Sequence, residues 1–317
     1  MRRLYMWMDG RARRRAGGRD PIEFSPVAIR ATLYSDPACP WAYSATPALT
    51  ALRWRYGDQL DWRLVTIGLR DETGTLAASG YTPARQATGS RRFRERYGMP
   101  FAAAPRARLV ASGRACRAIV ATRLAHPGRE FAVLRALAWG WFTTGLLLDE
   151  DEAIAAALQD VDGIDVAALV GALDSAAVSD AYAADKAEAR SAAGGPTEFQ
   201  GKAAVSDGLV RYTAPSVVFE SDGRRLEAGG FQPLEAYDVL LANLDPTMRR
   251  AAPPDGPLEL LEHFSEGLCT QEVATMLADN LIDVDRAAGE DALLALVADG
   301  RVTRSALGND AIWRSAG

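Results

Sequence analysis

Asp36-Pro37-Ala38-Cys39-Pro40-Trp41-Ala42-Tyr43 lies between an apolar, β-branched run at residues 27–34 and a helical pattern that begins at Pro40. Proline is common at the first position of a helix, because the N–H group that it lacks would have no partner there. Cys39 therefore occupies a strand-to-helix junction, close to free backbone N–H groups and the positive end of a helix dipole. This position predicts a nucleophilic cysteine with a lowered pKa.

The residue three positions after Cys39 is Ala42, where redox-active versions of this motif carry a second cysteine. The chain has three cysteines, too few and too scattered for a disulfide framework. Cys116 lies in an alanine-rich helical pattern and is expected to be a small buried hydrophobic residue. Cys269 is expected to be structural. Cys39 is thus expected to react without a neighbouring thiol, or to be a remnant on an inactive scaffold.

The composition is that of a soluble chain without special partners. The chain has 317 residues, 48% apolar and 24% charged, with a net charge of −5, which suggests two domains and neither a nucleic-acid nor a membrane partner. Residues 1–26 are rich in arginine and lack the apolar segment of a signal peptide, so we expect a disordered basic leader and a cytoplasmic protein. The spacing of histidines and cysteines gives no zinc site, and no nucleotide-binding glycine motif occurs, so no metal and no cofactor are expected.

The first half of the chain changes from mixed α/β patterns to helical ones. Residues 41–56 read as a helix that Pro47 should kink and that Gly57 ends. Residues 61–69 read as a second strand, which completes a βαβ unit. Residues 77–204 then carry helical periodicity with little β propensity.

The second half returns to β patterns and ends in a separate unit. Residues 209–220 predict a strand, Ser221-Asp222-Gly223 a turn, and residues 224–227 a return strand. Residues 243–257, rich in proline and aspartate, read as a linker. In residues 255–317, three short helices and a hairpin predict a winged-helix-like domain.

The first strand, the Asp-Pro-x-Cys-Pro-Trp entry and the late strand after Ala214-Pro215 resemble the DsbA-like branch of the thioredoxin superfamily. The resemblance is greatest to its cytosolic FrnE-like members and covers residues 27–244. It implies an α/β, thioredoxin-like fold made of residues 27–76 and 205–246. Residues 77–204 would be a helical insertion with a loop.

The same resemblance assigns the site residues. In this family the X-Pro bond before a buried strand is cis and faces the cysteine, which implies that Pro215 is the cis-proline. Cys39 would be the catalytic nucleophile, and the backbone of Ala214 would pair with an extended peptide or thiol substrate. Pro40 and Trp41 would complete the substrate-binding surface beside the cysteine.

The resemblance implies a thiol–disulfide oxidoreductase, and Ala42 makes it a monothiol one. Mixed disulfides on Cys39 would be resolved by a small thiol such as glutathione or mycothiol, so the partners would be a small thiol and a protein thiol or disulfide. One alternative is a thiol-dependent transferase or isomerase of kappa-class type. Another is a catalytically inactive scaffold that acts in protein binding or regulation. A homodimer is compatible with all three.

Two further features bear on these alternatives. Residues 85–108 contain seven arginines and one glutamate, which form either a solvated face or a binding surface for carboxylates. Trp139 and Trp141 either line an apolar cleft or pack in the core. The C-terminal unit has four arginines, no lysine and twelve acidic residues, so we expect it not to bind DNA and instead to contact its own chain, a second copy or another protein.

Overall fold

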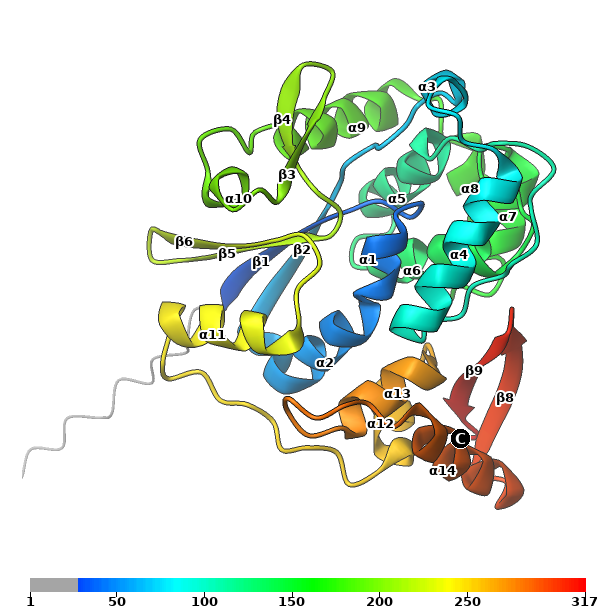
Figure 1. Cartoon of the computed structure of the whole chain (residues 1–317), viewed down its shortest axis with the longest axis vertical. Helices are drawn as coiled ribbons and strands as arrows, with labels where there is room; N and C mark the ends of the chain where they lie inside the picture. Colours follow the sequence, from blue (N-terminus) through cyan, green and yellow to red (C-terminus); the bar gives the residue numbers. More distant parts are fainter. Residues whose placement is uncertain (1–27) are drawn as a thin grey trace, which may run out of the picture.

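The computed structural model describes residues 28–317, so the basic leader predicted for residues 1–26 lies outside the described residues. The central strand β1 leads directly to the Cys39 motif, and it belongs to a sheet of order β2-β1-β5-β6 (Figure 1). β2 is parallel to β1, whereas β5 is antiparallel to β1 and β6 to β5. The strands are β1 (Ile29–Ser35), β2 (Leu60–Thr66), β5 (Ser216–Ser221) and β6 (Arg224–Gly229).

The hairpin between β5 and β6 has the predicted turn. Asp222 and Gly223 connect the two strands with φ values of 49° and 73°. Two successive residues of positive φ are what the tight type I′ turn requires, and glycine adopts this conformation without steric strain.

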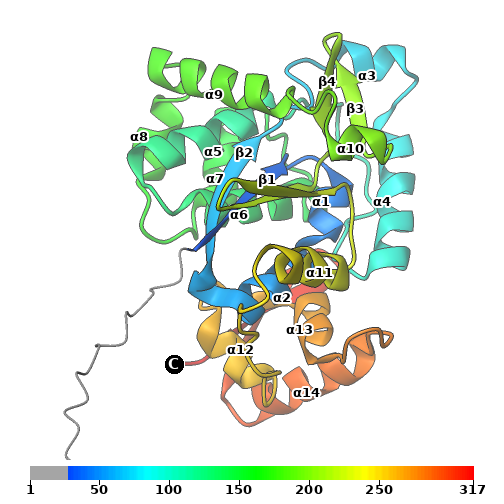
Figure 2. The same cartoon turned by 90° about the vertical axis from the view of Figure 1, so that its left-hand side faces the viewer.

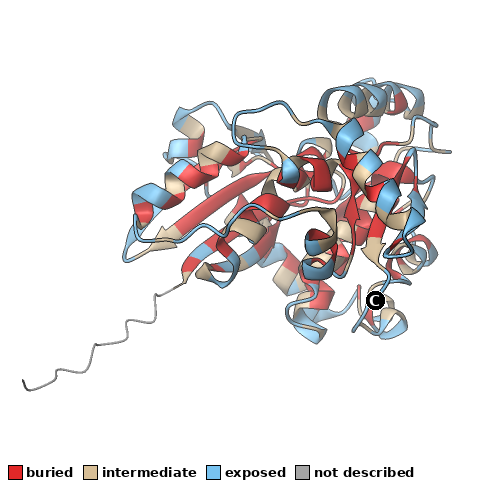
Figure 3. Cartoon of the chain, turned by 90° about the horizontal axis from the view of Figure 1, so that it is seen from below, coloured by how far each residue is buried: buried red, intermediate tan, exposed pale blue. Residues whose placement is uncertain are grey.

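The two faces of the sheet bury different clusters of side chains. Ile29, Ala31 and Leu33 belong to the larger cluster, which extends through the helical insertion and the C-terminal unit. Tyr34 belongs to a smaller cluster that also contains Cys39. The alternation follows from the two-residue period of a strand. Figure 3 shows buried residues along the strands and on the inward sides of the helices, with exposed residues outside.

The helices of the insertion lie where the periodicity predicted them. Most of the range 77–204 that was predicted to be helical forms helices, and α4 forms within the arginine-rich stretch. The short helices α3 (Gly74–Ala78) and α10 (Pro196–Phe199) were not predicted. The others are α4 (Pro83–Tyr97), α5 (Gly113–Ala125), α6 (Glu130–Thr143), α7 (Asp151–Leu158), α8 (Val166–Gly171) and α9 (Ala176–Ala189).

One predicted strand is in fact two. The β signal at residues 209–220 divides into β4 (Leu209–Tyr212) and β5, with Pro215 in the segment between them. β4 pairs with β3 (Ala203–Ser206) in a separate two-stranded hairpin. The prediction of one continuous strand was wrong because proline has no N–H to donate to a ladder.

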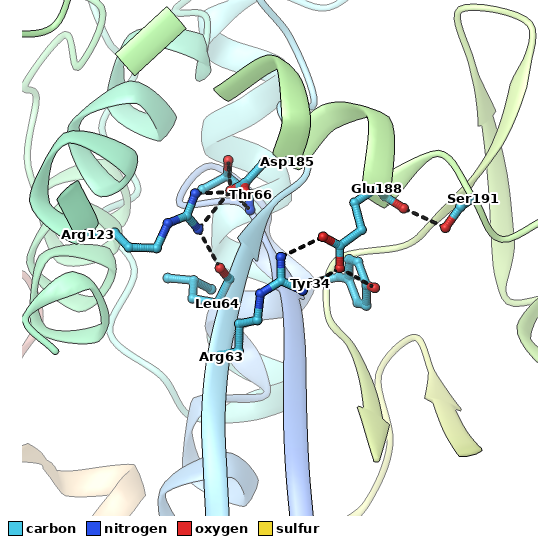
Figure 4. A network of polar contacts seen from close by, with 8 residues as sticks. All are labelled: Tyr34, Arg63, Leu64, Thr66, Arg123, Asp185, Glu188 and Ser191. Atoms are coloured by element: carbon cyan, nitrogen blue, oxygen red, sulfur yellow. Dashed lines mark hydrogen bonds and ion pairs between the residues drawn. The ribbon is translucent and has the colours of Figure 1, made fainter. Parts of the chain in front are cut away.

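Helix α9 is attached to the sheet by ion pairs (Figure 4). Asp185 accepts hydrogen bonds from the Thr66 backbone N–H at 2.8 Å and from Arg123 Nη2 at 2.8 Å. Glu188 accepts two hydrogen bonds of 2.6 Å from Arg63 and one of 3.1 Å from the Tyr34 hydroxyl. These contacts fix the end of α9, from which the chain continues toward β3.

The C-terminal unit contains the predicted three helices and hairpin. The short strand β7, which was not predicted, joins the hairpin in a sheet of order β7-β9-β8. The winged-helix-like description remains an interpretation of this element order. Its elements are α12 (Pro257–His263), β7 (Leu268–Cys269), α13 (Thr270–Leu277), α14 (Arg286–Ala298), β8 (Val302–Leu307) and β9 (Asp310–Ser315).

The C-terminal unit shares its core with the rest of the molecule. Helix α2 (Thr46–Tyr56) lies between the main sheet and α13, and α11 (Leu234–Leu244) packs beside it (Figure 2). Glu272 of α13 is fully buried, where it accepts hydrogen bonds from Arg135 at 2.5 and 2.6 Å and from Thr50 at 2.9 Å. The unit therefore packs on its own chain, which was one of the three predicted outcomes.

Candidate active site

Cys39 lies at the end of a tight turn that follows β1. Its backbone N–H donates to the Asp36 carbonyl oxygen at 3.0 Å, and Cys39 is the N-cap residue of α1 (Pro40–Ser44). The proline at the first helical position is tolerated because no hydrogen bond is lost there. The strand-to-helix junction predicted from the sequence is thus present.

The helix that follows Cys39 is shorter than expected. The predicted helix over residues 41–56 divides at Ala45 into α1 and α2. The predicted kink residue, Pro47, is in the first turn of α2, where its missing N–H is tolerated. A five-residue helix has a small dipole, so the local N–H groups carry most of the effect expected at the cysteine.

The Cys39 thiol is buried and protonated. Its side chain is 6% exposed, and Sγ donates a hydrogen bond to the Ala214 carbonyl oxygen at 3.0 Å. Burial raises the pKa of Cys39 to about 12, against the effect of the Ala42 and Trp41 N–H groups, which lower it. Asp36 raises the pKa further and Arg211 lowers it. The predicted lowering of the pKa was therefore wrong, because the sequence did not show how deeply the junction is covered.

The predicted cis-proline lies beside the cysteine. The Ala214–Pro215 peptide bond is cis, and the Ala214 carbonyl is the group that Cys39 contacts. Ala214 is 6% exposed, between β4 and β5. The structure therefore brings together Cys39, the predicted nucleophile, and Ala214, the residue predicted to pair with a substrate. Their roles in catalysis and substrate binding remain predictions.

Asp36 organises the base of the site. It accepts hydrogen bonds from the backbone N–H groups of Ala38 at 2.9 Å and Leu69 at 2.8 Å, and from the Ser112 hydroxyl at 3.0 Å. Cys116 Sγ lies 3.4 Å from the same carboxylate. Burial raises the pKa of Asp36 above its usual range, against these hydrogen bonds. Sequence reasoning missed this residue, although a carboxylate at the end of a strand was a visible signal.

The other two cysteines lie where the sequence predicted. Cys116 is fully buried in α5, and Cys269 is fully buried as the N-cap residue of α13. Both thiols are free. Burial raises their pKa values well above the usual value, so neither is expected to react readily.

A pocket of about 330 Å³ opens beside the cysteine. Ala38, Pro40 and Trp41, which flank Cys39 in sequence, line one side, and helix α4 and the segment before α5 line the other. Trp41 is 44% exposed, and its ring lies 4.9 Å from that of Phe93. Trp141 also lines this pocket, whereas Trp139 lines a second cavity.

The predicted arginine cluster has two parts. Arg85 and Arg106 line the pocket. Arg108 instead forms ion pairs of 2.6 Å with Asp149 and Glu150, and Arg91 pairs with Glu95 on the surface of α4. Part of the cluster is thus a solvated face, and part borders the candidate site.

Together, the sheet, the cysteine at the start of α1 and the cis-proline beside it define a protein of the thioredoxin fold with a helical insertion. The chain belongs to the family of DSBA-like thioredoxin domains, whose family model matches residues 31–212, more than half of the chain. This family carries the thiol oxidoreductase fold. No curated protein matches the chain.

Three solved structures of low sequence identity are similar to this chain, and the first two share its fold. A protein from Nitrosomonas europaea, provisionally assigned as a protein disulfide isomerase, has a TM-score of 0.52 at 17% identity, covering 68% of this chain and 97% of that one. A provisionally assigned DsbA oxidoreductase from Streptomyces coelicolor has a TM-score of 0.50 at 19% identity, covering 71% and 100%. The cytosolic disulfide reductase DsbM from Pseudomonas aeruginosa has a TM-score of 0.48 at 19% identity, covering 69% and 100%.

Within residues 28–317, no helix is long and apolar enough to cross a membrane. Within the same range, no three histidine, cysteine or acidic side chains gather as metal ligands.

Proposed function

We propose that the protein is a monothiol thiol–disulfide oxidoreductase in which Cys39 is the nucleophile. The observation that supports this proposal is the 3.0 Å contact between Cys39 Sγ and the Ala214 carbonyl oxygen, next to cis-Pro215. A substrate whose backbone pairs with Ala214 would present its sulfur to Cys39. Pro40 and Trp41 border the adjoining pocket and would contact the rest of the substrate.

The proposed cycle needs one protein cysteine and one small thiol. The Cys39 sulfur gives up its proton and attacks a substrate disulfide, whose S–S bond breaks while the leaving thiolate takes up a proton. A small thiol such as glutathione or mycothiol then attacks the mixed disulfide on the substrate sulfur. Cys39 is released as a thiol, and the substrate leaves as a mixed disulfide with the small thiol. The net result is that the small thiol replaces one of the two sulfurs of the substrate disulfide.

Substrate binding would also activate the thiol. A peptide that pairs with Ala214 competes for the carbonyl that now accepts the Cys39 proton. The Ala42 and Trp41 N–H groups and the charge of Arg211 already favour the thiolate. Removing the acceptor therefore shifts the balance toward ionisation.

A second candidate function is supported by the raised pKa of Cys39 and its burial. A scaffold that acts in protein binding or regulation has no need of an ionised thiol, and the resting structure keeps Cys39 neutral. A transferase or isomerase of kappa-class type, a cytoplasmic location and a homodimer remain predictions from the sequence.

The test is the formation of a mixed disulfide with a defined probe. Reduced protein is incubated with glutathione disulfide at pH 7 to 9, and the intact mass is followed with time. We expect one glutathione adduct that added glutathione removes, and none in the Cys39→Ser variant. An unmodified wild-type protein over the whole pH range would support the scaffold instead.

A further inference from the structure

The pocket beside Cys39 is positively charged and has no acidic lining. Three arginines line it: Arg70 after β2, Arg85 in α4 and Arg106 before α5. Among the described residues that line the pocket there is no aspartate or glutamate. A pocket with this charge favours an anionic ligand over a neutral or cationic one.

Of the three pocket arginines, Arg106 most clearly lacks an acceptor or an anion to pair with. Its Nε atom is buried, and no atom in residues 28–317 accepts a hydrogen bond from it. Its guanidinium carbon lies 5.1 Å from the centre of the Trp141 ring, a cation–π contact that orients the group without neutralising it. Burial lowers the pKa of Arg106 to about 10. A part-buried cation without an anion is unfavourable, so an anionic group in the pocket would stabilise Arg106.

Two other part-buried arginines of the chain have carboxylate partners. Arg123 pairs with Asp185 at 2.8 Å, and Arg135 pairs with Glu272 at 2.5 Å. Arg106 differs from these structural arginines because no ion pair joins it to a carboxylate in the described part of the chain. Its charge is therefore available to a ligand in the pocket.

Arg85 of α4 also lines this pocket and can assist Arg106. Its Nη1 donates to the Gly80 carbonyl oxygen at 3.3 Å, and its guanidinium carbon lies 5.4 Å from the centre of the Tyr81 ring. The remaining N–H groups of this exposed side chain are free to turn toward a ligand. Since guanidinium groups bind carboxylates through paired hydrogen bonds, two arginines that line the same pocket suit a ligand with more than one carboxylate.

We propose that the pocket lined by Arg70, Arg85 and Arg106 binds the carboxylates of the small thiol that resolves the mixed disulfide. This small thiol is then a peptide thiol that carries carboxylates, rather than a neutral sugar thiol. This inference rests on the proposed oxidoreductase function. Of the two thiols named from the sequence, glutathione has free carboxylates and mycothiol has none. The sulfur would lie at Cys39, and the carboxylates would extend past Pro40 and Trp41 into the pocket.

The experiment compares two disulfide probes of different charge. Glutathione disulfide carries carboxylates, whereas bis(2-hydroxyethyl) disulfide is neutral. The initial rate of mixed-disulfide formation on Cys39 is measured by intact mass for both probes at one pH. The rate with glutathione disulfide is divided by the rate with the neutral disulfide. The intrinsic reactivity of the Cys39 thiol cancels in this ratio, so the ratio reports only on recognition of the probe.

We expect Arg106→Gln to lower this ratio by about tenfold, the effect of losing a charge-assisted hydrogen bond of about 1.4 kcal/mol. Arg85→Gln, at an exposed position, should lower it by a smaller factor, and it tests the proposal if the Arg106 variant does not fold. Arg106→Lys should restore part of the preference. Arg92→Gln is the matched control, because Arg92 is exposed on α4 and does not line the pocket.

The outcomes separate this inference from the proposed function. Reaction of both probes with an unchanged ratio in the Arg106 and Arg85 variants would overturn the carboxylate pocket and leave the oxidoreductase intact. Failure of both probes to modify Cys39 would overturn the oxidoreductase and the pocket with it. If Arg92→Gln lowers the ratio as much as Arg106→Gln does, the carboxylate pocket is also overturned, since the decrease would then reflect net charge alone.

Discussion

At the scale of single residues, the protonation state of Cys39 decides when the protein can react. Burial raises the pKa of this thiol to about 12, so the thiolate fraction is small at neutral pH and grows as the pH rises. We expect alkylation by iodoacetamide to be slow at pH 7, with a midpoint well above the usual value of about 8.5. The measurement is the alkylation rate against pH.

The Cys39→Ser variant provides the background for this titration, because it retains the buried Cys116 and Cys269. A midpoint below 8.5 in the wild-type protein would show that the resting thiol is ionised, in contradiction to the hydrogen bond that it donates to Ala214.

Ala42→Cys should convert the site into a dithiol. Residues 39 and 42 are one helical turn apart, within the range of disulfide geometry. After mild oxidation, we expect the variant to lose two alkylatable thiols and, with dithiothreitol, to reduce insulin faster than the wild type. Ala48→Cys in α2 is the control, since it adds a thiol outside this turn. A variant that stays fully alkylatable would contradict the observed start of α1.

The part of the site that could be predicted is the part that lies in one stretch of sequence or belongs to a family pattern. The positions of Cys39 and Pro40 at the start of α1, and of cis-Pro215 beside the cysteine, were predicted in this way. The contacts of Asp36 with Ser112 could not be found, because they join residues 76 positions apart. The pKa of Cys39 could not be predicted either, since desolvation depends on every element that covers the sulfur.

At the scale of elements, α9 depends on a buried carboxylate. Asp185 is 3% exposed and accepts from Thr66 and Arg123. Asp185→Ala removes these acceptors and leaves a buried backbone N–H and a part-buried cation unpaired. We expect a loss of about 2–4 kcal/mol in the free energy of unfolding, measured by chemical denaturation.

Asp174→Ala is the matched control, since the Asp174 side chain is 75% exposed in its pair with Arg114. Such a pair contributes at most about 1 kcal/mol. Equal losses in the two variants would show that Asp185 does not fasten α9 to the sheet.

Element types were predicted more reliably than element ends. Long helices such as α5 and α6 have a periodicity that single residues do not obscure. The break at Ala45 and the division of the 209–220 strand both involve prolines, whose effect depends on which neighbour would have accepted the missing hydrogen bond. β7, with two residues, is too short to leave a pattern.

At the scale of the whole molecule, a buried ion pair connects the C-terminal unit to the insertion. Burial alone would raise the pKa of Glu272, but Arg135 and several hydrogen bonds hold it below its usual value. Glu272→Ala leaves Arg135 unpaired, and we expect a loss of about 3–5 kcal/mol in the free energy of unfolding. Because the folded-state pKa is lowered, this contribution is present at neutral pH and is lost as the pH falls through that pKa.

The measurement is denaturation of the wild type and the variant at pH 7 and at successively lower pH, where the difference between them should shrink. Glu266→Ala is the control, because Glu266 forms a 3.5 Å pair with Arg53 near the surface. A difference between wild type and Glu272→Ala that stays constant down to pH 3 would contradict the assigned charge of Glu272.

The hydrogen bond from Cys39 to Ala214 also has a consequence for survival under oxidative stress. Peroxides attack thiolates that solvent can reach, and each step up the ladder from sulfenic acid makes recovery harder. The Cys39 sulfur is neutral and its side chain is 6% exposed, so we expect it to react slowly with peroxides. If the Cys39 sulfur is released only when a substrate backbone binds Ala214, then only bound partners meet a reactive thiol. Oxidants free in solution would leave Cys39 unmodified.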